Sequence, residues 1–236
     1  MRSALFKICA LALLPMGGVA LSQPTHEAVE LVDSAYHVPV FSNEFITLLK
    51  VQMPPGRGSD FHHHRQDQIS VYMADYPAEA EGQEPGEPVH RIRPNGKGPY
   101  MGDVSFSNFT KKQLINRGQN GGATTMKVLQ AVFKSPSPYG FNPQPREGYT
   151  QVLDNDRVRA WRLILAPGQS APAISQTAPG MRIVVKGGDI AEISEGKRDR
   201  GMFLDPGDFF WQDAGPKRVV RNIGTTTVEL VEFELK

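Results

Sequence analysis

The sequence places three histidines side by side, at His62, His63 and His64, in the stretch "PPGRGSDFHHHRQDQISVYM". An alternating apolar run follows the triplet and predicts a β-strand. Because successive side chains of a strand point to opposite faces, His62 and His64 share one face and His63 points away. Two imidazoles on one face are candidate ligands for a metal such as Fe, Mn, Ni, Cu or Zn. The alternative is a solvated strand edge, or a polar patch that holds no metal.

No other catalytic pattern is present in the sequence. It lacks a Ser-His-Asp order, a P-loop, a GxGxxG that follows a strand, and an HExxH motif. The single cysteine, Cys9, lies in the N-terminal segment that is expected to be removed as a signal peptide. Thiolate chemistry is therefore not expected in the mature protein. With 26 basic and 25 acidic residues, the chain offers no charged surface for nucleic acid or an anionic membrane.

Residues 1–22 predict a signal peptide rather than part of the fold. A basic start at Arg2 and Lys7 precedes an apolar stretch, and the small residues Ala20 and Ser22 predict cleavage before Gln23. The apolar stretch is shorter than the roughly 20 residues that span a bilayer. We therefore expect a periplasmic or secreted protein with no membrane span after signal removal; a retained N-terminal anchor is the alternative.

The remaining sequence predicts an all-β fold. Short β-branched or aromatic runs such as "FITLLKVQM", "QISVYMADY", "RAWRLILA" and "VELVEFEL" alternate with turn residues, and the chain holds 23 glycines and 19 prolines. Residues 25–33, "THEAVELVD", are the one candidate for a short helix. Many short strands joined by frequent turns indicate a sandwich or barrel.

The chain also indicates an internal duplication. A shift of 112 residues places "VFSNEFITLLKVQMPPG" (40–56) on "VLDNDRVRAWRLILAPG" (152–168) without a gap, and "MGDVSF" resembles "PGDFFW" further on. A Pro-rich stretch separates the two halves and reads as a linker. The predicted domains are an N-terminal barrel with an inserted hairpin, a linker and a C-terminal barrel, at 23–134 with 75–100 inserted, 135–148 and 149–236.

These motifs together resemble the cupin superfamily. Gly56, five residues, His62 and His64, then Gln68 follow the spacing of the first cupin motif, in which the last position is usually Glu. Parts of the second motif recur in both halves, at Gly102–Asp103, Asn116 with Gly118, "DPGD" (205–208) and "RVVRNIG" (218–224). The resemblance implies a bicupin with two tandem double-stranded β-helix (jelly-roll) barrels.

The resemblance also implies a ligand set in the N-terminal barrel. His62 and His64 would be metal ligands, and Gln68 would offer a neutral oxygen in place of the usual carboxylate. Lys112 falls at the histidine position of the second motif, where an ammonium would repel a metal but would bind the carboxylate of a substrate. His90 is a candidate for the third imidazole, against the alternative of an exposed loop-edge residue.

The C-terminal barrel has lost the corresponding residues. Its motif positions carry Ile174, Gln176, Gly180 and Arg218, so no metal is expected there. A structural barrel is the favoured interpretation, and a small ligand in its interior is the alternative. An aromatic stretch ending at Trp211, "DFFW", is expected to fill a core, with a pocket lining as the alternative.

Two functions remain open from the sequence. One is an exported bicupin that binds a small, anionic metabolite and one divalent metal in its N-terminal barrel; family resemblance would then imply oxygenase, isomerase or lyase chemistry. The other is a metal-free cupin that binds a small molecule or acts as a structural or interaction protein. The resemblance also makes a homodimer plausible.

Overall fold

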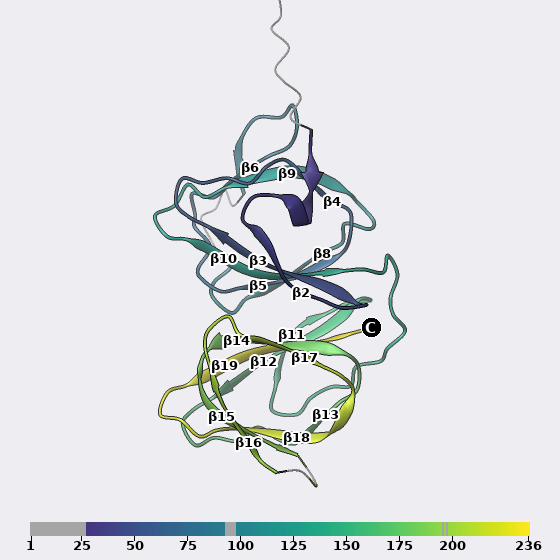
Figure 1. Ribbon diagram of the computed structural model, residues 1–236, viewed down its shortest axis with the longest axis vertical. Helices are drawn as coiled ribbons and strands as arrows, with labels where there is room; N and C mark the ends of the chain where they lie inside the picture. The colour runs from purple at the N-terminus through teal and green to yellow at the C-terminus, as the bar shows by residue number, and fades with distance from the viewer. Residues whose placement is uncertain (1–26, 93–97, 195, 197) are drawn as a thin grey trace, which may run out of the picture.

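The chain forms two pairs of β-sheets, one pair in each half (Figure 1). The structure is a computed structural model and describes residues 27–92, 98–194, 196 and 198–236. The predicted signal peptide lies outside the described residues. Among the described residues, no helix is both long and apolar enough to cross a membrane.

The N-terminal half consists of two five-stranded sheets. The inner sheet, which faces the other half, has the order β2 (His37–Ser42), β3 (Ile46–Met53), β10 (Met126–Phe133), β5 (Gln68–Tyr72) and β8 (Val104–Ser107). The outer sheet has the order β1 (Val29–Glu30), β4 (His62–His64), β9 (Leu114–Gln119), β6 (Glu81–Gln83) and β7 (His90–Arg91).

The C-terminal half repeats this arrangement. Its inner sheet has the order β11 (Thr150–Asp154), β12 (Val158–Leu165), β19 (Val228–Leu235), β14 (Gly180–Lys186) and β17 (Phe209–Gln212). Its outer sheet has the order β13 (Ile174–Gln176), β18 (Gly215–Asn222), β15 (Gly188–Ser194) and β16 (Arg200–Leu204). Each strand from β2 to β10 thus has a counterpart from β11 to β19 in the same place, which confirms two tandem jelly-roll barrels.

The inner sheets are buried on both faces, and strand alternation divides their side chains between two environments. On β5, Ile69 and Val71 belong to a buried apolar cluster shared by the two halves, whereas Ser70 and Tyr72 line a cavity inside the N-terminal barrel. β19 follows the same rule, so every residue of this strand is buried, including its glutamates.

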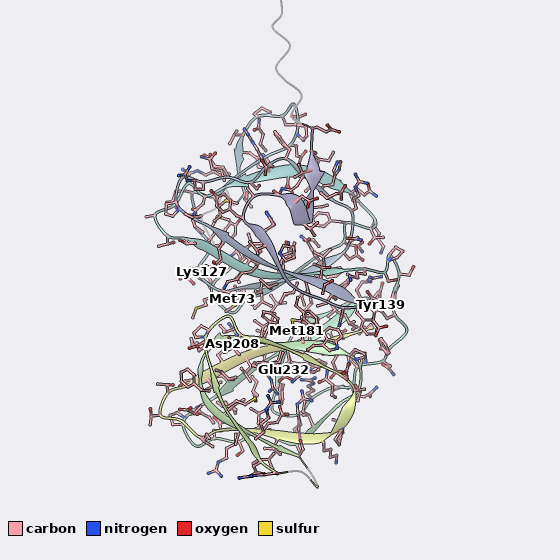
Figure 2. The ribbon with its side chains drawn as sticks, viewed as in Figure 1. Met73, Lys127, Tyr139, Met181, Asp208 and Glu232 are labelled. Carbon is pink, nitrogen blue, oxygen red and sulfur yellow. The ribbon has the colours of Figure 1, made fainter. Side chains whose placement is uncertain are left out.

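The two halves share one apolar core. It combines Leu48 and Phe133 of the first half with Met181 and Phe233 of the second, and Figure 2 shows Met181 between the two barrels. A buried ion pair crosses the same junction, from Arg157 Nε to Asp67 Oδ2 at 3.3 Å. The barrels are therefore packed face to face rather than joined only by a linker.

Two segments, 75–100 and 25–33, differ from their predictions. The stretch predicted as an insertion contributes β6 and β7, which are the counterparts of β15 and β16 and therefore part of the barrel itself. The predicted helix over 25–33 is corrected: residues 29–30 form β1, and only Leu31–Asp33 form a 3-10 turn, η1. The reason is tertiary pairing, because β1 lies parallel to β4 with Val29 opposite His62. Residues 25 and 26 lie outside the described part of the chain.

Candidate metal and ligand site

The central pair of the site, His62 and His64, comes from the short strand β4. Both side chains are buried, with 3% and 7% of their surface exposed, while His63 is half-buried on the opposite face. The pair lines a cavity of about 160 Å³ between the two sheets of the N-terminal barrel. Ser70, Tyr72 and Gln130 line the same cavity from the inner sheet.

Hydrogen bonds orient the two imidazoles. His62 Nδ1 lies 2.8 Å from the Asp60 carbonyl oxygen, which can only accept, so Nδ1 carries the hydrogen and Nε2 keeps its lone pair. That Nε2 lies 3.0 Å from His64 Nε2. His64 Nε2 in turn donates to Asn116 Oδ1 on β9 at 3.1 Å, so the lone pair of this imidazole is on Nδ1, which has no hydrogen-bond partner among the described residues. Two ring nitrogens and one amide oxygen therefore meet at one point of the cavity wall.

Both histidines are held in the neutral form. Burial, together with the neighbouring His64 and His37, lowers the pKa of His62 to about 3, although Asp60 acts in the opposite direction. Burial likewise lowers the pKa of His64 to about 4, although its bond to Asn116 acts in the opposite direction. Neutral imidazoles are the form that ligates a metal.

A third imidazole, His37, stands beside the pair and was not identified from the sequence. It lies on β2, in the other sheet, with its ring centroid 4.8 Å from that of His62, and it lines the same cavity. Its Nδ1 donates to the Ala35 carbonyl oxygen at 3.0 Å, so its Nε2 also keeps a lone pair. No spacing rule links His37 to the triplet; only the folded sheets bring them together.

The oxygen donors near the pair are amides. Within the described part of the chain, no group of three His, Cys, Asp or Glu side chains stands ready to hold a metal ion. Gln68 and Gln130 are buried, however, and the Oε1 atom of each has no hydrogen-bond partner among the described residues. The unpartnered atoms at this site thus include acceptors that would favour a cation.

The position predicted for Lys112 is corrected by the strand register. Lys112 is exposed in the turn before β9 and does not line the cavity, whereas Asn116 stands directly opposite His62. The sequence contains two Asn-x-Gly patterns four residues apart, and the second one, at Asn120, is the counterpart of Asn222. His90 is exposed on β7 and is not among the cavity residues.

The equivalence of Asn120 and Asn222 rests on matching hydrogen bonds. Asn120 Nδ2 donates to the carbonyl oxygens of Met53 and Thr124, at 2.8 Å each. Asn222 Nδ2 donates to those of Leu165 and Thr226, at 2.9 and 2.7 Å. The histidine position, four residues earlier, is therefore Asn116 in one half and Arg218 in the other.

Comparison with known proteins identifies the fold. No family model and no curated protein matches the sequence. Among solved structures, the oxalate decarboxylase of Lactobacillus farciminis is 10% identical and aligns over 81% of this chain and 77% of its own, with a TM-score of 0.54. Salicylate 1,2-dioxygenase of Pseudoaminobacter salicylatoxidans is 12% identical over 90% and 75%, with a TM-score of 0.52. The oxalate decarboxylase of Bacillus subtilis is 10% identical over 81% and 69%, also at 0.52.

These neighbours are cupins. The chain has the fold of a bicupin. At identities of 10 to 12% this likeness concerns the fold alone. It agrees with the two repeated barrels, and it leaves the chemistry of each barrel to be argued from its own residues.

The C-terminal cupin barrel carries different residues at the same places. Ile174 stands opposite Arg218, as His62 stands opposite Asn116, and the register also agrees with the predicted equivalence of Gly180 and Gln68. The side chain of Arg218 therefore enters the C-terminal barrel where the N-terminal barrel has an amide. A fixed positive charge replaces a potential metal ligand.

A buried ionic network fills this barrel and was not predicted. Glu232 of β19 accepts from Arg146, Arg182 and Arg218, and Figure 2 shows Glu232 within the C-terminal barrel. Arg146 comes from the predicted linker, yet it is buried here and also donates to Glu234. Alternate glutamates in "VELVEFEL" were the sequence signal, because alternation directs Glu232 and Glu234 into the barrel.

Trp211 packs against the shared core and also lines the cavity of the C-terminal barrel. Its indole ring is stacked on Phe45 of the N-terminal half, with ring centroids 5.7 Å apart, and it belongs to the core between the barrels. The neighbouring Phe210 instead packs against the core of the C-terminal barrel and lines its cavity.

Proposed function

We propose that the N-terminal barrel of this bicupin binds one divalent transition-metal ion through His62 and His64, together with a small anionic molecule. The observation that carries the proposal is the meeting of His62 Nε2, His64 Nε2 and Asn116 Oδ1, with separations of 3.0 and 3.1 Å. Imidazole nitrogens with amide oxygens form a donor set suited to Mn, Fe, Ni, Cu or Zn.

Each residue at the site has a definite role in this proposal. The bond from His62 Nδ1 to Asp60 fixes the tautomer that presents Nε2 to a metal. Gln68 and Asn116 supply amide oxygens, Gln68 either to the metal or to His64. His37 is the candidate for a third nitrogen ligand. A bound metal would supply Lewis acidity or activate oxygen.

The neutral character of these donors bears on the ligand. None of His62, His64, Gln68 and Asn116 carries a negative charge when the imidazoles are neutral, so the donors do not offset the charge of a divalent ion. An anionic molecule would supply that missing charge. The cavity of about 160 Å³ limits it to a small molecule.

The comparisons support the metal in a general way. Mn(II) centres are a feature of the oxalate decarboxylase of Bacillus subtilis, a structure with the same fold. That metal belongs to the neighbour, and the proposal for this chain rests on its own histidines. A homodimer stays a prediction.

The test is metal binding by the untagged mature protein. We expect elemental analysis or titration with Mn(II), Fe(II), Ni(II), Cu(II) and Zn(II) to give one bound ion per chain for at least one of them. The His62→Ala/His64→Ala double variant should bind at least about tenfold more weakly, because it removes both nitrogen donors. His63→Ala is the matched control and should bind as the wild type does, since His63 points away from the cavity.

Two outcomes would overturn this proposal. One is protein that binds none of the five ions; the other is binding that persists unchanged in the double variant. The first outcome would favour a metal-free cupin that binds its ligand by hydrogen bonds alone. The absence of a ready group of three His, Cys, Asp or Glu side chains in the described residues is the observation that favours this second candidate.

We also propose that the protein is exported. The proposal rests on residues 1–22, in which a basic start, an apolar stretch and the small residues Ala20 and Ser22 match a signal peptide. Protein recovered from the periplasm or medium should begin at Gln23 by N-terminal sequencing. Full-length protein retained in the cytoplasm would contradict export, and full-length protein in the membrane fraction would indicate the anchor instead.

A further inference from the structure

A second cavity, of about 250 Å³, lies inside the C-terminal barrel. Arg182, Glu192 and Arg218 give it a charged wall, and Met202 and Phe210 give it an apolar one. The exposed Arg200 also lines it. These residues come from β14 to β18, so the cavity is separate from the histidine site, which lies within the other barrel.

The charged wall contains a guanidinium group with an unused donor. The side chain of Arg182 is only 1% exposed. Its Nε donates to Glu232 Oε1 at 2.7 Å and its Nη1 donates to Glu192 Oε2 at 2.9 Å. Its Nη2 has no hydrogen-bond partner within the described part of the chain. Leaving a buried charged donor without an acceptor is costly. Because Arg182 lines the cavity, its guanidinium group indicates a ligand that accepts hydrogen bonds.

Arg218 adds a second donor to the same wall. Its Nη2 is occupied by Gln176, Gln212 and Glu232. Its Nε, however, is 3.8 Å from Glu192 Oε2, too far for a hydrogen bond, and it has no other partner among the described residues.

The carboxylates near this wall are already engaged. Glu232 is shared by three guanidinium groups, and Glu192 lies against both Arg182 and Arg218. Asp213, a further acidic residue that lines the cavity, accepts from the indole of Trp211. A cationic ligand would meet Arg182 and Arg218, whereas an anionic one would meet their unpaired N–H groups.

We propose that this cavity binds a small organic carboxylate whose apolar body packs against Met202 and Phe210. The planar fork of a guanidinium group matches the two oxygens of a carboxylate. The volume lies below the roughly 300 to 1,000 Å³ of sites for drug-sized ligands, so the carboxylate must be small.

The duplication gives this assignment a structural basis. Arg182 of β14 and Ser70 of β5 occupy equivalent positions, because each stands opposite the equivalent residue of the last strand, Glu232 or Gln130. In the N-terminal barrel the unpartnered buried atoms include the amide oxygens of Gln68 and Gln130; in the C-terminal barrel they include guanidinium nitrogens. The side chains of the two copies have thus diverged: those of the N-terminal barrel favour a metal cation, and those of the C-terminal barrel contact an anion directly.

The experiment is calorimetric titration of the full mature chain with benzoate and hexanoate as probes. At least one of the two should bind with a dissociation constant of roughly 1 mM or tighter. The neutral isostere, benzamide or hexanamide, should bind at least about tenfold more weakly, because charge-assisted hydrogen bonds to guanidinium are lost. Absence of binding by both carboxylates, or equal binding of acid and amide, would overturn the proposal.

Variants locate the binding. Ser194 lines the cavity at the end of β15, and Ser194→Phe should fill it and weaken binding by at least about tenfold, while Ser194→Ala should retain it. Arg200→Gln is a second variant at an exposed position, so it tests the charged rim without disturbing the core; binding should weaken about two- to fivefold at low salt. Unchanged binding in both Ser194→Phe and Arg200→Gln would refute the assignment.

The histidine site provides an independent control. The His62→Ala/His64→Ala variant should bind the carboxylate as tightly as the wild type, because its changes lie in the other barrel. Loss of binding in that variant would place the carboxylate in the N-terminal cavity and overturn the inference.

Discussion

The buried carboxylate of Glu232 accepts hydrogen bonds from three arginines inside the C-terminal barrel. Burial alone would raise the pKa of this carboxyl group, but the charges of Arg182, Arg146 and Arg218 lower it to about 2, from an ordinary 4.5. Glu232 is 1% exposed and keeps its negative charge at neutral pH. The carboxylate therefore neutralises guanidinium groups that would otherwise repel one another inside the barrel.

Replacing this carboxylate should make the protein less stable at neutral pH. Glu232→Gln leaves buried guanidinium groups without their counter-charge, so we expect the free energy of unfolding at pH 7 to fall by about 3 to 5 kcal/mol. Because the folded-state pKa is lowered, the contribution of Glu232 is present above pH 4.5 and is lost as the pH falls toward 2. The gap between wild type and variant should thus narrow by about 1.4 kcal/mol per pH unit in that window.

Urea unfolding at pH 7, 4.5 and 3 measures both effects. Glu44→Gln is the control, since Glu44 is exposed in the turn between β2 and β3 and should leave stability nearly unchanged at each pH. A gap between wild type and Glu232→Gln that stays constant from pH 4.5 to pH 3 would contradict the ionised state of Glu232.

Residues of the two sites also differ in whether their positions can be predicted from the sequence. His62 and His64 can be placed together because strand parity is a local rule. His37 cannot, since its approach to His62 depends on how two sheets pack. Arg146 is equally hidden: a proline-rich segment predicts an extended connection, and only the folded chain brings its guanidinium to Glu232.

At the scale of elements, the duplication was predictable because β3 and β12 keep the same alternation and the same turns. Gly102 and Gly207, in the turns that resemble each other in sequence, have backbone φ angles of 88° and 94°. These are left-handed conformations that glycine adopts without strain. Both glycine amides donate to the preceding inner strand, to Tyr72 and Val184 respectively.

The outer strands were harder to align. One Asn-x-Gly pattern begins within β9, at Asn116, and a second begins directly after it, at Asn120. Local sequence does not distinguish them. The distinction is made by β3, because only Asn120 donates to the carbonyl oxygen of Met53 at the end of that strand. Taking Asn116 rather than Asn120 as the motif's asparagine moves the predicted histidine position by four residues. It then falls on the exposed Lys112 instead of on Asn116, the residue opposite His62.

At the scale of the molecule, the two barrels share one apolar core. Their inner sheets pack face to face, with Leu48, Ile69 and Phe133 meeting Met181 and Phe233 in one core. Figure 1 shows the two inner sheets facing each other across the middle of the molecule. Neither barrel alone covers these side chains, so each barrel depends on the other to keep its inner sheet from water.

This dependence predicts that damage to one half lowers the stability of both. Phe133 lies in the N-terminal half and is fully buried at the junction, where the guanidinium of Arg157 packs over its ring. Phe133→Ala should cost about 3 to 5 kcal/mol of stability. Trp161 lies in the core of the C-terminal barrel, whereas Trp211 contacts Phe45 of the N-terminal half, so in a Trp211→Phe background the fluorescence reports on the undamaged barrel. The urea midpoint by fluorescence should fall together with the midpoint by circular dichroism, whereas Ile164→Ala, at an exposed position, should shift neither. A fluorescence midpoint that stays at the wild-type value while circular dichroism shows an earlier transition would mean that the barrels unfold independently.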